Sequence, residues 1–77
     1  MSPTLLLKEG FKFFFYANEH LPKHIHVEKG DDYATIDLSS MTVRESYMKR
    51  SDLKIALVMV EANRELFERK WDEFFKR

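Results

Sequence analysis

The spacing of apolar residues changes once along this chain, at about residue 50, and that change constrains the fold more than any other feature. Before it, residues 4 to about 38 alternate in polarity and are interrupted by turn residues, which is typical of β-strands. From about residue 51 a stripe recurs at spacings of four and three, as on one face of an α-helix; it runs through Leu53, Leu57, Val60, Arg64, Phe67, Trp71 and Phe74. The order of the two patterns predicts an α+β fold with the strands first.

Four strands are expected, at residues 4–8, 11–17, 24–28 and 33–38, joined as an antiparallel meander. Gly10 permits the positive φ of a tight hairpin, and the glycine and aspartates of residues 29–32 indicate a second turn. The second strand carries aromatic side chains on both faces, which predicts a central strand at least partly covered on both sides. Residues 39–50 are polar and without a clear period, so no strand is expected there.

The C-terminal segment is expected to pack on one face of the sheet, as one long helix or as two short ones. Ser51 is a plausible N-cap, with Asp52 in the first turn. A single helix of about 25 residues would be about 37 Å long. That is long for so small a sheet, so a break near Asn63 is as plausible as continuity.

The size of the chain permits one domain, residues 1–77, with a small margin of stability. Domains this small often add disulfides, a metal or a partner subunit, and disulfides are excluded because the chain has no cysteine. Thirteen basic residues balance 13 acidic ones, so the chain lacks the overall basic charge of a nucleic-acid binder. No segment resembles a signal peptide or a membrane span, so we expect a cytoplasmic protein without a membrane partner, and no cofactor is expected.

All three histidines, His20, His24 and His26, lie within seven residues at the start of the third strand. His24 and His26 project from the same face of that strand, with Pro22 stiffening its approach. If the turn at residues 29–32 is symmetric, paired residue numbers sum to about 61. His24 then lies opposite Asp37, and a carboxylate there would orient the imidazole and raise its pKa.

This pattern leaves several chemistries open. His24 and His26 could act as acid and base on a phosphate, with Asp37 orienting them. A metal site is less expected, because zinc usually takes three or four protein ligands; if present, it would use His20, His24 and His26. The histidines could equally form a hydrogen-bonded polar face with no chemistry.

Two further groups of residues have both a functional and a structural interpretation. Lys23, Lys12, Arg44 and Arg50 could bind a nucleic-acid backbone, which makes RNA a possible partner, although a solvated charged surface is the commoner explanation. Trp71, Phe74 and Phe75 could contact a small partner protein or a second copy, although anchoring of the helix on the sheet is more usual. Lys12, Phe14 and Tyr16 form a strand face that could stack a base, although a second small core under the C-terminal helix is the more usual explanation.

The order of these features resembles the bacterial DUF4160 family over nearly the whole chain. The most specific parts are P-K-H-I-H-V-E at residues 22–28 and W-D-E-F-F at residues 71–75, together with the Phe/Tyr-rich second strand. Family members usually have two prolines before the first histidine of this motif, and here Lys23 takes the place of the second.

The resemblance implies a small bacterial protein of unknown function. Members of the family are often encoded beside a DUF2442 protein, an organisation similar to toxin–antitoxin pairs. It therefore favours an interaction module of a two-gene system. The alternatives are a small RNase-like or phosphate-directed enzyme that uses His24 and His26, and a structural metal site.

Overall fold

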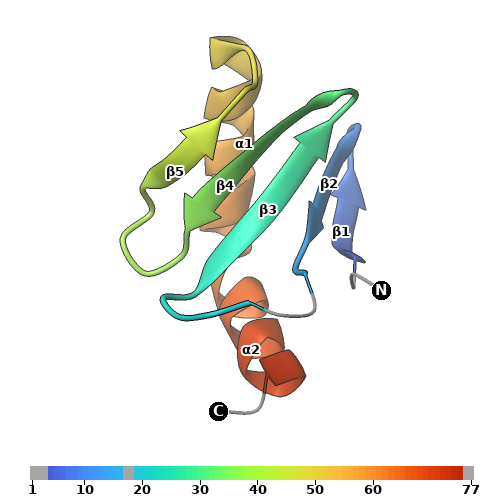
Figure 1. The fold of residues 1–77 in the computed structure, drawn as a ribbon. Helices are drawn as coiled ribbons and strands as arrows, with labels where there is room; N and C mark the ends of the chain where they lie inside the picture. The colour runs from blue at the N-terminus through green and yellow to red at the C-terminus, as the bar shows by residue number, and fades with distance from the viewer. Residues whose placement is uncertain (1–3, 17–18, 76–77) are drawn as a thin grey trace.

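A computed structural model describes residues 4–16 and 19–75. Five strands come first: β1 (Thr4–Lys8), β2 (Phe11–Phe14), β3 (His24–Lys29), β4 (Asp32–Asp37) and β5 (Val43–Ser46). Two helices follow, α1 (Arg50–Ala62) and α2 (Arg64–Phe75). The strands form one sheet in the order β1-β2-β3-β4-β5 with every pair antiparallel (Figure 1). The predicted α+β class and the meander are confirmed, and the number of strands was predicted one too low.

The additional strand, β5, lies where an irregular segment was expected. It pairs with β4 at the edge of the sheet, where Ala34 lies opposite Ser46 and Thr35 opposite Glu45. Its residues are exposed or half-buried, so none of them has to be apolar. An edge strand with no buried face shows no alternation of polarity, and the sequence pattern therefore gives no signal for it.

Helix α1 and helix α2 are separate, and the break falls at Asn63, as one of the two alternatives predicted. The Asn63 side-chain amide donates to the Met59 carbonyl over 2.8 Å, and the Asn63 carbonyl accepts from the Phe67 N–H over 2.9 Å at the start of α2. Ser51 is not the N-cap, because α1 begins one residue earlier; Lys49 occupies that position without a side-chain cap, and its carbonyl accepts from the Leu53 N–H over 2.9 Å.

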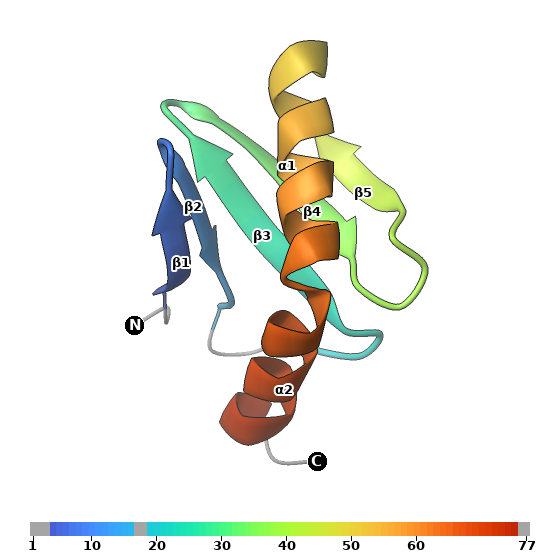
Figure 2. The same ribbon diagram turned by 180° about the vertical axis from the view of Figure 1, so that it is seen from behind.

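The core lies between the sheet and the helices, which both cover the same face (Figure 2). The second strand ends at Phe14, earlier than the expected residue 17, but the expected alternation is present: Phe11, Phe13 and, just after the strand, Phe15 are all fully buried in this layer. Phe67 of α2 packs on Phe13 with ring centroids 5.5 Å apart, and Trp71 packs on Phe15 at 5.2 Å. No described helix is long and apolar enough to cross a membrane.

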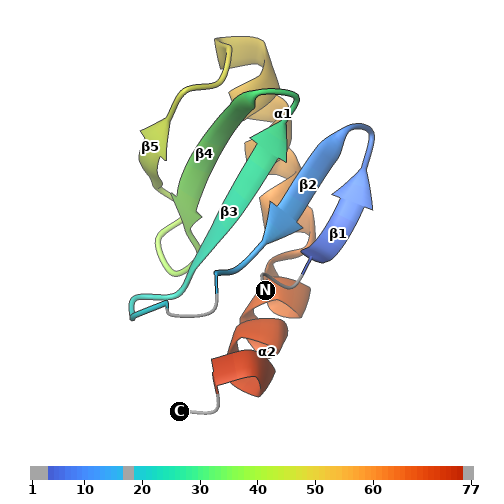
Figure 3. The ribbon, with the colours of Figure 1, turned by 45° about the vertical axis from the view of Figure 1, so that its right-hand side comes forward.

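The second face of the sheet has no described helix over it, so the expectation of a second core there is wrong (Figure 3). Phe14 is nevertheless only 4% exposed. The rings of Tyr16 and His26 lie 5.3 and 5.5 Å from it, and the Lys12 ammonium lies 5.5 Å above it. Neighbouring side chains on the sheet therefore bury this phenylalanine without a second layer.

Candidate functional site

The start of β3 places His24 and His26 on the helix-free face of the sheet, because alternate residues of a strand share a face. Their ring centroids are 5.3 Å apart. The predicted register with β4 is confirmed: His24 pairs with Asp37 and His26 pairs with Thr35. The two intervening core positions also match, with Ile25 opposite Ile36.

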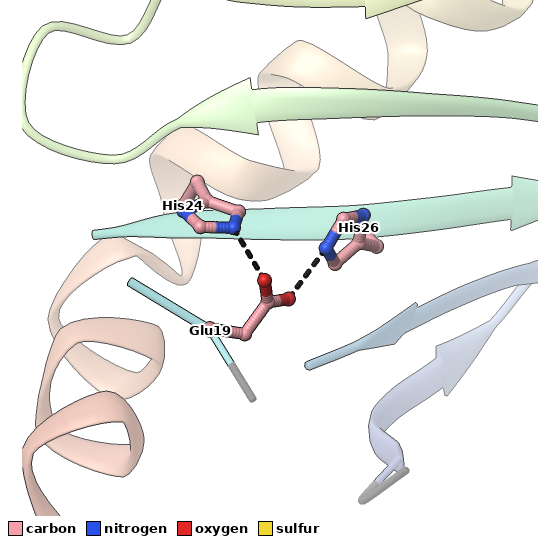
Figure 4. Close-up of side chains that lie close together, drawn as sticks. All are labelled: Glu19, His24 and His26. Atoms are coloured by element: carbon pink, nitrogen blue, oxygen red, sulfur yellow. Dashed lines mark hydrogen bonds and ion pairs between the residues drawn. The ribbon is translucent and has the colours of Figure 1, made fainter. Parts of the chain in front are cut away.

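A third residue, Glu19, joins the two histidines (Figure 4). It lies in the segment between β2 and β3, and its carboxylate points between the two rings. Nε2 of His24 donates to one carboxylate oxygen over 2.8 Å, and Nε2 of His26 donates to the other over 2.5 Å. The Tyr16 backbone N–H donates to the same carboxylate over 3.0 Å. We call Glu19, His24 and His26 the His–Glu cluster.

The other nitrogen of each ring is also anchored. Nδ1 of His24 donates to the Pro22 carbonyl over 2.8 Å, and Nδ1 of His26 lies 3.2 Å from the Thr35 hydroxyl. Glu19 and the Pro22 carbonyl thus hold the His24 ring through both of its nitrogens. Because Nε2 donates to Glu19, Nδ1 of a neutral His26 accepts from the Thr35 hydroxyl.

The His–Glu cluster is largely shielded from water. The side chains of His24, Glu19 and His26 are 6%, 10% and 16% exposed. Burial acts to raise the pKa of the Glu19 carboxyl, but the Tyr16 N–H and the two histidines outweigh it and hold that pKa below its ordinary value. Burial lowers the pKa of His26, although Glu19 acts in the opposite direction. These shifts favour an ionised Glu19 beside a neutral His26.

Asp37 does not partner the histidines, although it lies opposite His24 in the register. Its carboxylate accepts from the backbone N–H groups of Ser39 and Ser40 over 3.0 and 3.2 Å, and it lies 3.5 Å from the Arg44 guanidinium. Burial acts to raise the pKa of Asp37, but these donors lower it overall. Asp37 therefore shapes the turn after β4, and Glu19 takes the role expected of it.

The remaining candidate residues do not converge on the cluster as one surface. Lys23 forms an ion pair with Asp72 of α2 over 2.9 Å. Lys12 lies over Phe14, and Arg44 donates to the Pro22 carbonyl over 3.1 Å. Arg50 begins α1, at the opposite end of the sheet from the start of β3 (Figure 1). The expected basic surface is thus divided among separate contacts.

The C-terminal aromatic residues mainly belong to the core. Trp71 is 2% exposed, and its ring lies 5.2 Å from His24 and 4.4 Å from Phe75. Phe74 is the exposed member of the three, at 44%. His20 is exposed and lies with Trp71 and Phe75 around a cleft of about 110 Å³ beside Glu19. His20 is therefore near the cluster but outside it.

Sequence reasoning missed Glu19 because the residue lies in a loop, where no periodicity fixes which way a side chain points. The only available signal was local composition: one acidic residue and three histidines occur within residues 19–26.

The fold and the site together define a class of small α+β protein: a five-stranded antiparallel meander, two helices on one face, and a cluster of two histidines and a carboxylate at the entrance to the central strand. The model of the domain of unknown function DUF4160 matches residues 10–72, so the chain belongs to that family. Neither the curated proteins nor the solved structures include a significant match.

Proposed function

We propose that this protein binds a divalent transition-metal ion through Glu19, His24 and His26. The observation that carries the proposal is the convergence of three potential ligand atoms, two imidazole nitrogens and one carboxylate oxygen, all within 4.8 Å of one another. Metal-binding histidines usually donate their second ring nitrogen to a carbonyl, carboxylate or water, which fixes the ring. His24 has such a partner in the Pro22 carbonyl, and Thr35 offers His26 a hydroxyl.

The spacing of the cluster suits an ion after its side chains adjust. A metal bound at about 2.0–2.1 Å sets neighbouring ligand atoms about 2.9–3.4 Å apart. The two oxygen–nitrogen contacts, at 2.8 and 2.5 Å, are slightly shorter than this. Glu19 would have to move outward by a few tenths of an ångström, and the most widely spaced of the three ligand atoms, which lie up to 4.8 Å apart, would have to move closer together. An ion at this position would replace the protons that now join the rings to Glu19.

The ligand types favour zinc, iron, nickel or copper over magnesium or calcium, because imidazole suits the first group and an all-oxygen shell suits the second. Three protein ligands leave at least one coordination position for water or another small molecule. The adjoining cleft of about 110 Å³ has room for water, which occupies about 30 Å³. Pockets that hold drug-sized ligands are larger, at about 300–1,000 Å³.

The RNase-like alternative has less support. Acid–base cleavage requires two imidazoles that reach a phosphate, and here both Nε2 atoms are hydrogen-bonded to one carboxylate in a largely buried cluster. A role as an interaction module of a two-gene system is compatible with metal binding. It remains a second proposal, and the exposed apolar residues on α1 favour it.

The test uses Trp71, the single tryptophan of the chain, because its ring lies 5.2 Å from His24. We expect Co²⁺, Ni²⁺ or Cu²⁺ to quench Trp71 fluorescence saturably in protein first treated with a chelator, and calorimetry with Zn²⁺ to give one ion per chain. Glu19→Gln should weaken Zn²⁺ binding by at least about 100-fold, more than is typical for loss of a supporting residue.

His20→Ala and Glu45→Gln are the matched controls, since neither residue belongs to the cluster. Both variants should bind Zn²⁺ as the wild-type protein does. Absence of saturable binding would refute the proposal, and so would equal affinity of the wild-type protein and folded Glu19→Gln. Loss of Zn²⁺ binding in His20→Ala would show that the ligands are His20, His24 and His26, as expected from the sequence, and not Glu19.

A further inference from the structure

Helix α1 carries a second apolar stripe that faces away from the sheet. Its inner side, with Ala56, Met59 and Val60, is buried in the core. On its outer side, Ile55 is 45% exposed and Val58 is 69% exposed. No other described segment covers this side of α1 (Figure 2). The sheet therefore accounts for only one of the two apolar faces of the helix.

The outer stripe has the spacing of a helix–helix seam. Ser51, Ile55, Val58 and Ala62 are separated by four, three and four residues, and all are exposed. This alternation keeps side chains in register along the contact between two helices. The stripe that was predicted from the sequence faces inward, so this seam is a separate feature of the same helix.

Hollows flank Val58 on both sides and could receive side chains from another helix. One, of about 420 Å³, lies between α1 and the β1–β2 turn and is lined by Ile55, Val58 and Met59, among others. The other, of about 520 Å³, lies beside Met41 and Leu57. Both have more apolar than polar lining, as expected for a surface of ridges and holes that packs against a helix.

The charges beside the seam favour a second copy of this chain as the occupant. Lys54 and Glu61 flank the seam seven residues apart on the same side, and neither forms an ion pair with another described residue. In an antiparallel pair of α1 helices, Ile55 packs on Val58 of the second copy, and Lys54 then lies beside Glu61 of that copy. In a parallel pair, each residue would lie level with the same residue of the second copy, and Lys54 would have no acidic partner.

We infer that two copies of the protein associate through the outer faces of their α1 helices, packed antiparallel about a two-fold axis. The contact is self-complementary, as a two-fold interface must be: the Lys54–Glu61 and Ile55–Val58 pairs each occur twice. It is also small, because a helix of 13 residues is about 20 Å long. Stable complexes usually bury about 800 Å² per partner, so we expect a weak dimer, with a dissociation constant on the order of 0.1 mM.

The test is sedimentation equilibrium of the full chain in a chelator, from about 10 µM to about 1 mM, with the fold checked by circular dichroism. The wild-type protein changes from one chain to two over this range. Val58→Arg raises the dissociation constant at least about tenfold, because the seam centre then carries a buried charge. Leu7→Arg is the matched control, since Leu7 is equally exposed, at 71%, but lies on β1.

A charge exchange tests the antiparallel orientation. Lys54→Glu and Glu61→Lys each raise the dimer dissociation constant by about three- to tenfold at low salt. The two changes together restore that constant to within about twofold of the wild-type value. The chain has no cysteine, so oxidative cross-linking offers a second test. A mixture of Ile55→Cys and Val58→Cys chains cross-links more than either variant alone.

Three results would overturn the inference. The first is a monomer at about 1 mM, which leaves the face to a different partner. The second is association that Leu7→Arg abolishes and Val58→Arg does not. The third is a pair of observations. The double charge exchange fails to restore the dimer affinity that the single changes reduce, and each single-cysteine variant cross-links better alone than in the mixture.

Discussion

Replacing Glu19 by glutamine should destabilise the metal-free protein strongly. The Glu19 carboxylate accepts three hydrogen bonds, from the Tyr16 N–H and from Nε2 of His24 and His26. Glutamine has only one acceptor oxygen, and its amide would place donors against an imidazole that also donates. Hydrogen bonds to charged groups contribute about 1.5–3 kcal/mol each. Losing one or two of them should therefore cost about 2–4 kcal/mol.

That loss is a large part of the total stability of so small a domain, which is about 5 kcal/mol or somewhat more. For a chain of this length, 1 kcal/mol shifts the melting temperature by about 4–8 °C, so Glu19→Gln should lower it by about 10–25 °C. The measurement is thermal and urea unfolding at pH 7 in a chelator, with exposed Glu45→Gln as the control. A change of less than about 0.5 kcal/mol in Glu19→Gln, equal to that expected in the control, would refute this account of the cluster.

The dependence on pH gives the same reasoning a second check. The pKa of His26 in the folded protein lies below its ordinary value of 6.5. As the pH falls below 6.5, the unfolded chain therefore binds a proton at His26 before the folded chain does, and the free energy of unfolding decreases. The pKa of Glu19 is also lowered from 4.5, so its stabilising effect is lost only as the pH falls below 4.5, through the folded-state pKa. Wild-type stability should therefore decline in two stages between about pH 6.5 and the acid limit, and the second stage should be smaller in Glu19→Gln, where Asp37 still contributes to it. An identical decline in both proteins would contradict this assignment.

Three smaller predictions follow from other contacts. Asp37→Asn should cost about 0.5–1.5 kcal/mol at pH 7. Because the pKa of Asp37 is lowered from 3.8, the difference from the wild-type protein in urea unfolding should persist above that value and vanish only below it. Thr35→Val should weaken Zn²⁺ binding by about tenfold in calorimetry, since Thr35 anchors Nδ1 of His26. Gly10→Ala should lower the melting temperature by about 4–12 °C, because Gly10 has φ +84° and an added Cβ would lie 3.3 Å from the Lys29 side chain.

The sequence predicted the pairing of β3 with β4 residue by residue. This was possible because two independent signals agreed: the glycine turn set the register, and alternation on both strands matched core residues to core residues. The same register did not predict the side-chain contact between His24 and Asp37. Asp37 lies where β4 ends and the backbone N–H groups of Ser39 and Ser40 lack strand partners, so its carboxylate binds those donors.

The features that escaped prediction have no hydrophobic period of their own. Glu19 lies in a loop, and β5 is an edge strand without a buried face. The break at Asn63 could be anticipated only as one of two alternatives, because the apolar stripe continues through α1 and α2. The predicted stripe through Leu53, Leu57 and Val60 does face inward, but it gave no indication of a second apolar face on α1.

The metal site and the α1 seam should act independently, because they lie on opposite sides of the protein. The His–Glu cluster is on the helix-free face of the sheet, and the core layer separates it from the outer face of α1. One path between them runs from His24 through Trp71 into α2 and across the break at Asn63. Sites without shared contacts usually have additive effects, within about 0.3–0.5 kcal/mol. Saturating Zn²⁺ should therefore raise the melting temperature of the wild-type protein and of Val58→Arg equally, and should change the dimer dissociation constant by less than about twofold. A larger change, measured by sedimentation with and without Zn²⁺, would show that α2 transmits metal binding to the seam.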